Sequence, residues 1–493
     1  MKKKMLFLLT ILLLFFGILF IKVAEWVPLT YGDIPFEQVL FHILVPIHGT
    51  DTFFVNSFIK HCLPMPIIVS CILLLFYVLI VSKSKIKNKI YIVTLIVCLF
   101  TCVFGITDCI YAVGIDKYYY NVVHPTKIYE NYYVDPSTVE YSFPEQKRNL
   151  IYIFMESMEI TYQDLEHAGA FEESRIPELT ELADKNLTFS YGNNNNNGFL
   201  VPSLSGWTVA AMIGQTSGIP LNIPVDSNGY FDNQSFLPGA YSIGEILNIN
   251  GYKNELLIGS DADFAGRRYY FEQHGNYDIK DYHSAMKKGW INNGYFVWWG
   301  YEDIKLFEYI KNELTRLASF DEPFNFTTLT ADTHHIGGYL CSECEDLYGG
   351  DQYSNVIRCS SKHVTELVQW IQEQPWYENT TIVLAGDHKS MDPDWFKNIE
   401  ESGYNRKCYY AIINSAAKPT TQNSRKITTY DLFPTTLASL GVTFNSDRLG
   451  LGTNLYTDEE TLVEKLGFKK FDKELIRHSN YYDKFIIYRR RKN

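Results

Sequence analysis

Residues 380–388 read TTIVLAGDH, and the last two side chains of this stretch have the chemistry to bind a metal ion. The apolar run before them is typical of a strand that is buried on both faces of a parallel sheet. Ligands of open α/β sheets bind beyond the carboxyl ends of the strands, which is where Asp387 and His388 would lie. A carboxylate and an imidazole side by side offer an oxygen and a nitrogen ligand. Taken alone, the pair fits a surface loop better, so other residues must complete the site.

Three further apolar runs also end in titratable side chains. They are residues 149–155, followed by Glu156; residues 255–259, followed by Asp261 and Asp263; and residues 324–330, followed by Asp332, His334 and His335. Each polar residue has an ordinary structural explanation by itself, because Glu156 could cap a helix, the aspartates could form turns and His334 could be a buried structural histidine. Four strands that all end in this way point to a functional site at one edge of one sheet.

Amphipathic helical patterns separate these apolar runs. They cover residues 176–186, 242–250, 302–319 and 361–374. Alternation of buried strands with such helices predicts an α/β domain whose mostly parallel sheet is sandwiched by helices. Helices on both faces would explain why the strands are apolar throughout.

A nucleophile could come from the segment between the first two strands. Residues 209–213 (VAAMI) have a helical pattern with small side chains, and three hydroxyl residues precede it: Ser203, Ser205 and Thr208. Serine and threonine at a helix start are ordinarily N-caps. A helix N-terminus also favours a bound phosphate, and a hydroxyl that coordinates a divalent cation loses its proton more readily. The local sequence does not choose among the three.

Three apolar stretches are long enough to cross a bilayer as helices: about residues 5–27, 63–82 and 90–115. Lysines precede the first stretch, and four more lie between the second and the third, at positions 83, 85, 87 and 89. The positive-inside rule places both groups in the cytoplasm. We therefore expect a membrane domain over residues 1–115 and, outside the cell, an extended linker (116–148), a catalytic domain (149–457) and a C-terminal tail (458–493).

The formal net charge is −12, and basic residues gather in the expected cytoplasmic loops and at the C-terminal end, which argues against nucleic-acid binding. Five of the nine cysteines lie in or beside the expected spans and would be small apolar packing residues. Cys341 and Cys344 have the spacing of a zinc-ligand pair, but no second Cys/His pair at ligand spacing is evident after them. We expect instead a disulfide from Cys341 or Cys344 to Cys359.

Several segments of the exterior part resemble the alkaline-phosphatase/sulfatase superfamily. Within it they are most similar to the phosphoglycerol transferases of bacterial envelopes. This group includes lipoteichoic acid synthase and the periplasmic-glucan phosphoglycerol transferase, and the segments resemble the second of these more. The matching segments follow the family's order between about residues 149 and 455: residues 149–162, 208–221, 264–266, 328–335, 375–376 with 387–388, and 449–452. The formylglycine signature of true sulfatases, Cys/Ser-x-Pro-x-Arg, does not occur.

The resemblance implies a metal site with a nucleophile beside it. Glu156, Asp387 and His388 match metal ligands of the family. Counting back from a later Gly-Ile-Pro segment puts the nucleophile, which is also a metal ligand, at Ser205. The family usually has threonine there, so the serine is a departure and Thr208 is a second candidate.

The resemblance also implies residues that contact the substrate. Arg267 matches a phosphate-binding arginine, and a guanidinium suits bidentate binding of phosphate. His334 matches a catalytic histidine that contacts the phosphoglycerol group. Asp261 lies one position away from a substrate-binding aspartate, and Ile336 replaces a proline that is common after the histidine motif.

The implied reaction transfers glycerol phosphate from phosphatidylglycerol to an envelope glycan or polyol-phosphate polymer, such as a glucan or a lipoteichoic acid, through a glycerophospho-serine intermediate. One divalent cation would serve as cofactor: Mn2+ first, with Mg2+ or Zn2+ as alternatives. The protein would be a multi-pass protein of the bacterial cell membrane with an extracytoplasmic catalytic domain. A phosphodiesterase or phosphatase-type hydrolase, a phosphoethanolamine transferase of the same superfamily and an inactive membrane-bound scaffold remain as alternative interpretations.

Overall fold

The computed structural model describes residues 2–32, 34–44, 52–79, 81–189, 198–223, 235–420 and 425–489. The chain forms two compact units. The first combines Met1–Leu40 with Thr50–Val123, and the second combines Phe41–Gly49 with His124–Asn493. The first unit contains the stretches expected to cross the membrane, and the second contains every candidate site residue.

The first unit is built on four helices: α1 (Lys2–Tyr31), α3 (Thr52–Cys62), α4 (Pro64–Leu79) and α5 (Lys87–Val113). They include three segments that are long and apolar enough to cross a membrane: Met5–Tyr31, Val55–Leu79 and Lys87–Val113. Only 17% of the most apolar part of each segment is buried within the chain, so the remaining apolar surface needs lipid around it. The protein is therefore a membrane protein. The second segment begins earlier than expected because α3 leads directly into α4.

Helices α1 and α5 pack closely through glycine. A Cβ added at Gly105 would lie 2.2 Å from the carbonyl oxygen of Gly17, and one added at Gly17 would lie 2.8 Å from the Cys102 backbone. Small residues allow membrane helices to approach at this range, where van der Waals contacts between backbones hold them together.

The second unit is built on a seven-stranded sheet with the strand order β3-β8-β7-β2-β6-β4-β5. Strands β7, β2, β6, β4 and β5 are parallel, β8 runs antiparallel to β7, and β3 runs antiparallel to β8. Their bounds are β2 (Asn149–Met155), β3 (Gly198–Phe199), β4 (Lys253–Ile258), β5 (Asp278–Lys280), β6 (Phe324–Leu329), β7 (Thr380–Gly386) and β8 (Cys408–Ile413). This arrangement confirms the predicted α/β fold with a mostly parallel sheet.

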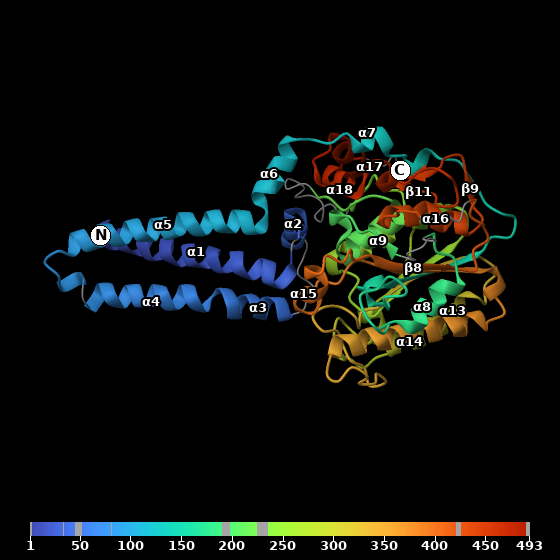
Figure 1. Cartoon of the computed structure of the whole chain (residues 1–493), viewed down its shortest axis with the longest axis horizontal. Helices are drawn as coiled ribbons and strands as arrows, with labels where there is room; N and C mark the ends of the chain where they lie inside the picture. The colour runs from blue at the N-terminus through green and yellow to red at the C-terminus, as the bar shows by residue number, and fades with distance from the viewer. Residues whose placement is uncertain are drawn as a thin grey trace. The chain divides into compact units, whose positions relative to one another are not determined.

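Helices cover both faces of this sheet (Figure 1). Alternate residues of β2 point into two separate cores, with Leu150 and Phe154 on one side and Ile151 and Ile153 on the other. The first core is closed by α9 (Thr208–Ser217), α10 (Ile243–Ile249) and α16 (Leu432–Ser439). The second is closed by α8 (Pro177–Lys185), α13 (Asp303–Leu317) and α14 (Gln352–Gln372). Burial on both faces explains the uninterrupted apolar runs of the strands.

The register of the parallel strands brings their carboxyl ends to one edge. Met155 of β2 pairs with Gly386 of β7, and Phe154 pairs with Leu329 of β6. The residues that follow these strand ends, Glu156 and Asp387 among them, must therefore lie side by side.

Two segments expected to be irregular contain helices. The stretch expected as an extended linker holds most of α6 (Ile115–Val123) and all of α7 (Ile128–Tyr132). The stretch expected as a tail holds α17 (Leu462–Leu466), α18 (Phe468–Ile476) and α19 (Asn480–Tyr482). Phe471 and Leu475 of α18 are fully buried in the same core as α9, because their spacing forms one apolar face of a helix. Residues up to 489 are thus part of the second unit.

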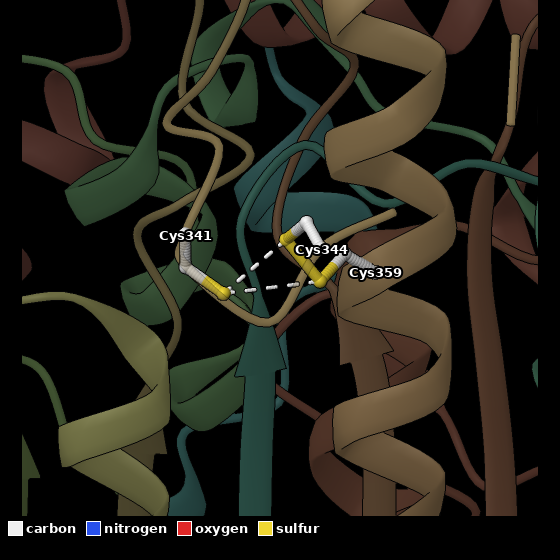
Figure 2. Close-up of side chains that lie close together, drawn as sticks. All are labelled: Cys341, Cys344 and Cys359. Carbon is white, nitrogen blue, oxygen red and sulfur yellow. Dashed lines mark hydrogen bonds between the residues drawn. A yellow bond between two sulfur atoms is a disulfide. The ribbon is translucent and has the colours of Figure 1, made fainter. Parts of the chain in front are cut away.

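The remaining helices are α2 (Phe36–Leu44), α11 (Arg267–Gln273), α12 (Tyr282–Lys287) and α15 (Pro393–Glu401). Two small antiparallel pairs complete the described strands: β1 (Tyr141–Ser142) with β9 (Thr443–Phe444), and β10 (Arg448–Leu449) with β11 (Gly452–Thr453). A disulfide joins Cys344, in the loop before α14, to Cys359 within α14, which is one of the two pairings expected (Figure 2).

Candidate active site

Glu156, Asp387 and His388 form a buried cluster at the carboxyl edge of the sheet. One ligand atom from each lies within 4.8 Å of the other two. The three residues are at most 2% exposed. The structure thus brings together three of the four residues that were expected as metal ligands, and the fourth, Ser205, is described below.

Backbone hydrogen bonds fix the Asp387 carboxylate at the end of β7. The N–H groups of Ser157 and His388 donate to its Oδ1 at 2.8 and 2.7 Å. Its Oδ2 is buried and has no hydrogen-bond partner among the described residues. A buried carboxylate oxygen without a donor is costly, so this atom is suited to a cation.

The His388 ring presents Nε2 to both carboxylates. Its Nδ1 lies 2.8 Å from the carbonyl oxygen of Lys389, which can only accept, so Nδ1 carries a proton. Its Nε2 lies 3.4 Å from Asp387 Oδ2 and 3.5 Å from Glu156 Oε1. A histidine whose Nδ1–H is held by a carbonyl in this way is oriented to ligate a metal through Nε2.

The electrostatics of the cluster indicate that a positive charge belongs in it. Burial, and then the charge of Glu156, raise the pKa of Asp387 to about 8. Burial would lower the pKa of His388, but the two carboxylates outweigh it and raise this pKa. Burial also opposes ionisation of Glu156, yet His334, His388 and the Ser157 hydroxyl together lower its pKa. A divalent cation would satisfy both carboxylates, and the donor set of two oxygens and one imidazole fits such an ion.

Of the three candidate nucleophiles, Thr208, the first residue of α9, is the one whose hydroxyl lies at this cluster. Its Oγ1 is 3.3 Å from Glu156 Oε2, to which it donates, and 3.4 Å from His388 Nε2. The side chain is half-buried. Its position at the start of a ten-residue helix also places free backbone N–H groups and the positive end of the helix dipole beside it.

The structure does not bring Ser205 to the cluster. Ser205 ends a short 3-10 turn, Ser203–Ser205, and its hydroxyl donates to the Tyr430 hydroxyl at 3.0 Å. It packs beneath α9, where a Cβ added at Gly214 would lie 3.2 Å from its Oγ. The separation arises because Trp207 is extended (φ −141°, ψ 158°) and divides this turn from α9. The third candidate, Ser203, donates through its hydroxyl and backbone N–H to the carboxylate of Asp472 in α18, each at 2.7 Å.

Arg267 lies beside the cluster and has the charge and the donor groups needed to bind an anion. It is 4% exposed, and its Nε has no hydrogen-bond partner among the described residues. One of its terminal nitrogens donates to the carbonyl oxygen of Asp261 at 2.6 Å. Burial lowers its pKa to about 10 against the opposing charges of Asp261 and Glu156, so it remains charged at neutral pH.

His334 and Asp261 lie around the same strand ends. His334 Nδ1 is 2.7 Å from the carbonyl oxygen of His335, and its charge lowers the pKa of Glu156. The Asp261 carboxylate is 3.0 Å from Nε2 of His283, while its backbone carbonyl holds Arg267. The structure thus assigns Asp261 a bond to Arg267 through the main chain, with its side chain held by a neighbouring histidine.

Two tryptophans were not predicted as part of this region. The Trp299 ring lies 4.4 Å from the His334 ring and 5.5 Å from the Phe264 ring, measured between centroids. The indole N–H groups of Trp298 and Trp299 are buried and have no hydrogen-bond partner among the described residues. Buried indole N–H groups usually have one, so these two donors are available to a polar ligand. The Trp-Trp-Gly sequence at 298–300 was the available signal.

Comparison with known proteins identifies the class to which this fold and cluster belong. The sequence model of the Sulfatase family matches residues 148–442, which is more than half of the chain, and the chain therefore belongs to that family. Phosphoglycerol transferase I of Xanthomonas axonopodis pv. citri is 34% identical over 278 residues, covering 53% of this chain and 37% of that protein. Phosphoglycerol transferase I of Escherichia coli is 30% identical over 328 residues, covering 65% of this chain and 40% of that protein. The chain thus spans less than half the length of these relatives.

A solved structure supports the fold assignment. The chain is similar to a protein of the alkaline phosphatase superfamily from Vibrio parahaemolyticus, with a TM-score of 0.50 and 18% identity over 67% of this chain and 76% of that one. Together with the family match, this confirms the expected resemblance to the alkaline-phosphatase/sulfatase superfamily.

Proposed function

We propose that this protein transfers glycerol phosphate from phosphatidylglycerol to a glycan or polyol-phosphate polymer of the bacterial cell envelope, with Thr208 as the nucleophile. The observation that carries the proposal is the hydroxyl of Thr208, which lies at a helix N-terminus within hydrogen-bond reach of Glu156 and His388. A positioned hydroxyl beside carboxylates, with a guanidinium whose Nε has no hydrogen-bond partner among the described residues, suits attack on a phosphodiester. The relatives named phosphoglycerol transferase I support the choice of the transferred group.

The cluster would hold the cofactor. Glu156, Asp387 and His388, with Thr208 as the fourth ligand, would bind one divalent cation, which we propose to be Mn2+, with Mg2+ and Zn2+ as alternatives. Asp387 Oδ2, which has no hydrogen-bond partner among the described residues, and His388 Nε2, which faces both carboxylates, support this assignment. When bound, the cation would supply Lewis acidity that acidifies the threonine hydroxyl and balances charge on the phosphate.

In the first step, Thr208 Oγ1 attacks the phosphorus of phosphatidylglycerol. The hydroxyl proton passes to Glu156 Oε2, which lies 3.3 Å from Thr208 Oγ1. The bond between phosphorus and the diacylglycerol oxygen breaks, and His334 protonates that oxygen as diacylglycerol leaves. Arg267 neutralises the non-bridging oxygens, and the indole N–H of Trp299, beside His334, donates to the glycerol headgroup. In the second step, an acceptor hydroxyl attacks the same phosphorus and gives its proton to His334, the bond between phosphorus and Thr208 Oγ1 breaks, and Thr208 regains its proton from Glu156.

The arrangement in the membrane follows from the lysines and the apolar helices. We propose a multi-pass protein of the bacterial cell membrane, with the lysines between α4 and α5 in the cytoplasm and the catalytic unit outside. A catalytic unit on that side faces the headgroups of the outer leaflet, where its lipid donor is present, and also the envelope polymers that accept the group.

The test is to incubate the detergent-purified full chain with phosphatidylglycerol and Mn2+ and to search for a covalent adduct by intact mass. We expect one glycerophosphoryl group per chain, and peptide mapping should locate it on Thr208. An adduct on Ser205, or none on a metal-loaded chain, would contradict the proposal. Glycerol phosphate that appears free in solution, and not on an added polymer, would indicate a hydrolase. An adduct that forms only from phosphatidylethanolamine would indicate a phosphoethanolamine transferase.

A further inference from the structure

Three cysteines meet in the second unit, in a cluster that the proposed reaction does not use (Figure 2). The Sγ of Cys341 lies 3.2 Å from that of Cys344 and 3.9 Å from that of Cys359. Cys341 is 4% exposed and Cys359 is 8% exposed. Their sulfur atoms form one of two groups in the described part of the chain whose ligand atoms are close enough to hold a metal ion.

A histidine lies beside one of these sulfurs, that of Cys359. His363 lies one turn after Cys359 on the same face of α14, and its Nδ1 is 3.9 Å from the Cys359 Sγ. Its ring is 7% exposed, and its Nε2 has no hydrogen-bond partner among the described residues. That Nε2 is 3.9 Å from the carboxylate of Glu343, the residue before Cys344. Metal-binding histidines characteristically have a carboxylate facing their second ring nitrogen.

The spacing of these residues is that of a structural zinc site. Cys341-x2-Cys344 lies in a loop, and Cys359-x3-His363 follows on a helix. Cys3His zinc sites commonly combine two such pairs of ligands. In the first pair two residues separate the ligands, and in the second the ligands lie one helical turn apart. The expectation that no second Cys/His pair at ligand spacing follows Cys344 was therefore wrong, because Cys359 and His363 have that spacing in the sequence. Only the fold shows that α14 turns this second pair toward the loop.

We propose that Cys341, Cys344, Cys359 and His363 bind one Zn2+ when the Cys344–Cys359 disulfide is reduced. In a tetrahedral site with zinc–sulfur bonds near 2.3 Å, sulfur atoms stand about 3.8 Å apart. The two contacts of Cys341, at 3.2 and 3.9 Å, bracket that separation, and reduction frees Cys344 and Cys359 to move apart to the same range. The disulfide and the zinc site are then two alternative states of one cluster.

The chemistry of the exchange balances. A phosphine or a dithiol supplies two electrons, and the disulfide becomes two thiols after it takes up two protons. Zinc binding releases the protons of all three thiols, and the imidazole binds in its neutral form, so the site carries a single negative charge. Burial lowers the pKa of His363, which keeps the ring neutral at physiological pH. Burial raises the pKa of Cys341, so without a cation this group stays a thiol.

Cobalt absorption tests the proposal on the detergent-purified full chain. The chain is reduced with a phosphine, alkylation of a sample confirms that the disulfide is open, and Co2+ is added. We expect a near-ultraviolet sulfur-to-cobalt band at one ion per chain that Zn2+ abolishes. The cluster of Glu156, Asp387 and His388 contains no sulfur and cannot produce this band. Without reduction the band should be absent.

Three variants assign the ligands. Cys341→Ser should reduce the band by about a third or abolish it, and His363→Gln should weaken zinc binding by about tenfold or more. Cys408→Ser removes a buried free thiol outside the cluster and should leave the band unchanged. Absence of a band from the fully reduced chain would overturn the proposal, as would a band that Cys341→Ser leaves intact. Thermal unfolding of each variant in its oxidised state shows whether it is folded, and His363→Gln keeps the test valid if Cys341→Ser is not.

Discussion

At the scale of residues, two hydroxyls three positions apart have different surroundings. Thr208 donates to a metal-ligand candidate, while Ser205 donates to Tyr430 inside the core. The contrast provides a matched pair of substitutions. Thr208→Ala should lower transfer from phosphatidylglycerol by about 1,000-fold or more, because it removes the attacking oxygen, and Thr208→Ser should retain part of the activity.

Ser205→Ala is the control for this prediction. It should keep the transfer rate within about threefold and cost roughly 1 kcal/mol of stability, the usual value for one lost hydrogen bond. Initial rates with labelled lipid and thermal unfolding measure the two effects. If Ser205→Ala abolishes transfer while Thr208→Ala does not, the nucleophile is Ser205.

The buried carboxylate of Asp387 makes the stability of the metal-free protein depend on pH. Its pKa is raised from 3.8 to about 8 in the folded chain, so between these values the folded state binds more protons than the unfolded state. The contribution of this group to stability is therefore full below about pH 4 and is lost as the pH rises toward 8. Asp387→Asn removes the titration.

We therefore expect Asp387→Asn to raise the melting temperature of the metal-free protein more at pH 8 than at pH 5, and excess Mn2+ to stabilise only the wild-type chain. Thermal unfolding in the presence of a chelator measures the difference. An effect of the substitution that does not change with pH would contradict the raised pKa.

At the scale of elements, the strand ends depend on close backbone packing. A Cβ added at Gly386, the last residue of β7, would lie 2.0 Å from the carbonyl oxygen of Met158. Gly386→Ala should therefore displace Asp387 and His388, cost about 3 kcal/mol and abolish metal binding at the cluster. Gly206→Ala meets only an ordinary contact at 3.4 Å and should be close to neutral. Calorimetric Mn2+ titration and melting temperatures measure both, and equal effects of the two substitutions would refute this assignment.

The strands and the three metal-ligand candidates could be predicted from the sequence because buried parallel strands leave continuous apolar runs. Their shared edge follows from the parallel order alone. The position of Thr208 could not be predicted in the same way. Ser205 and Thr208 are close enough in sequence to belong to one helix start, and only the extended backbone at Trp207 separates their directions.

The C-terminal helices also escaped prediction, because they depend on one helix face that meets a partner far away in the sequence. The Cys359–His363 pair, in contrast, could have been predicted, because its ligand spacing is present in the sequence. Helix α18 carries many charged residues, so its short apolar face resembles that of a solvated helix until the core it covers is known.

At the scale of the whole molecule, the proposed topology predicts which lysines a membrane-impermeant reagent reaches. In intact cells without an outer membrane, we expect the reagent to label exposed lysines of the second unit, such as Lys185. Lys85 and Lys87 should not be labelled. Permeabilised cells provide the control, since all three should then react. Peptide mass spectrometry reads the outcome, and labelling of Lys85 in intact cells would reverse the orientation.

The contact between Ser203 and Asp472 has a consequence for biosynthesis. Helix α18 anchors the turn before α9, and it is translated after every strand of the sheet. In the proposed topology, a nascent chain that has placed all its strands outside the membrane therefore still lacks the support for its proposed nucleophile. Competence to react with the surrounding lipid should be acquired late, once α18 has been exported and docked, so a partly translocated chain cannot attack the lipid of the bilayer that it is crossing.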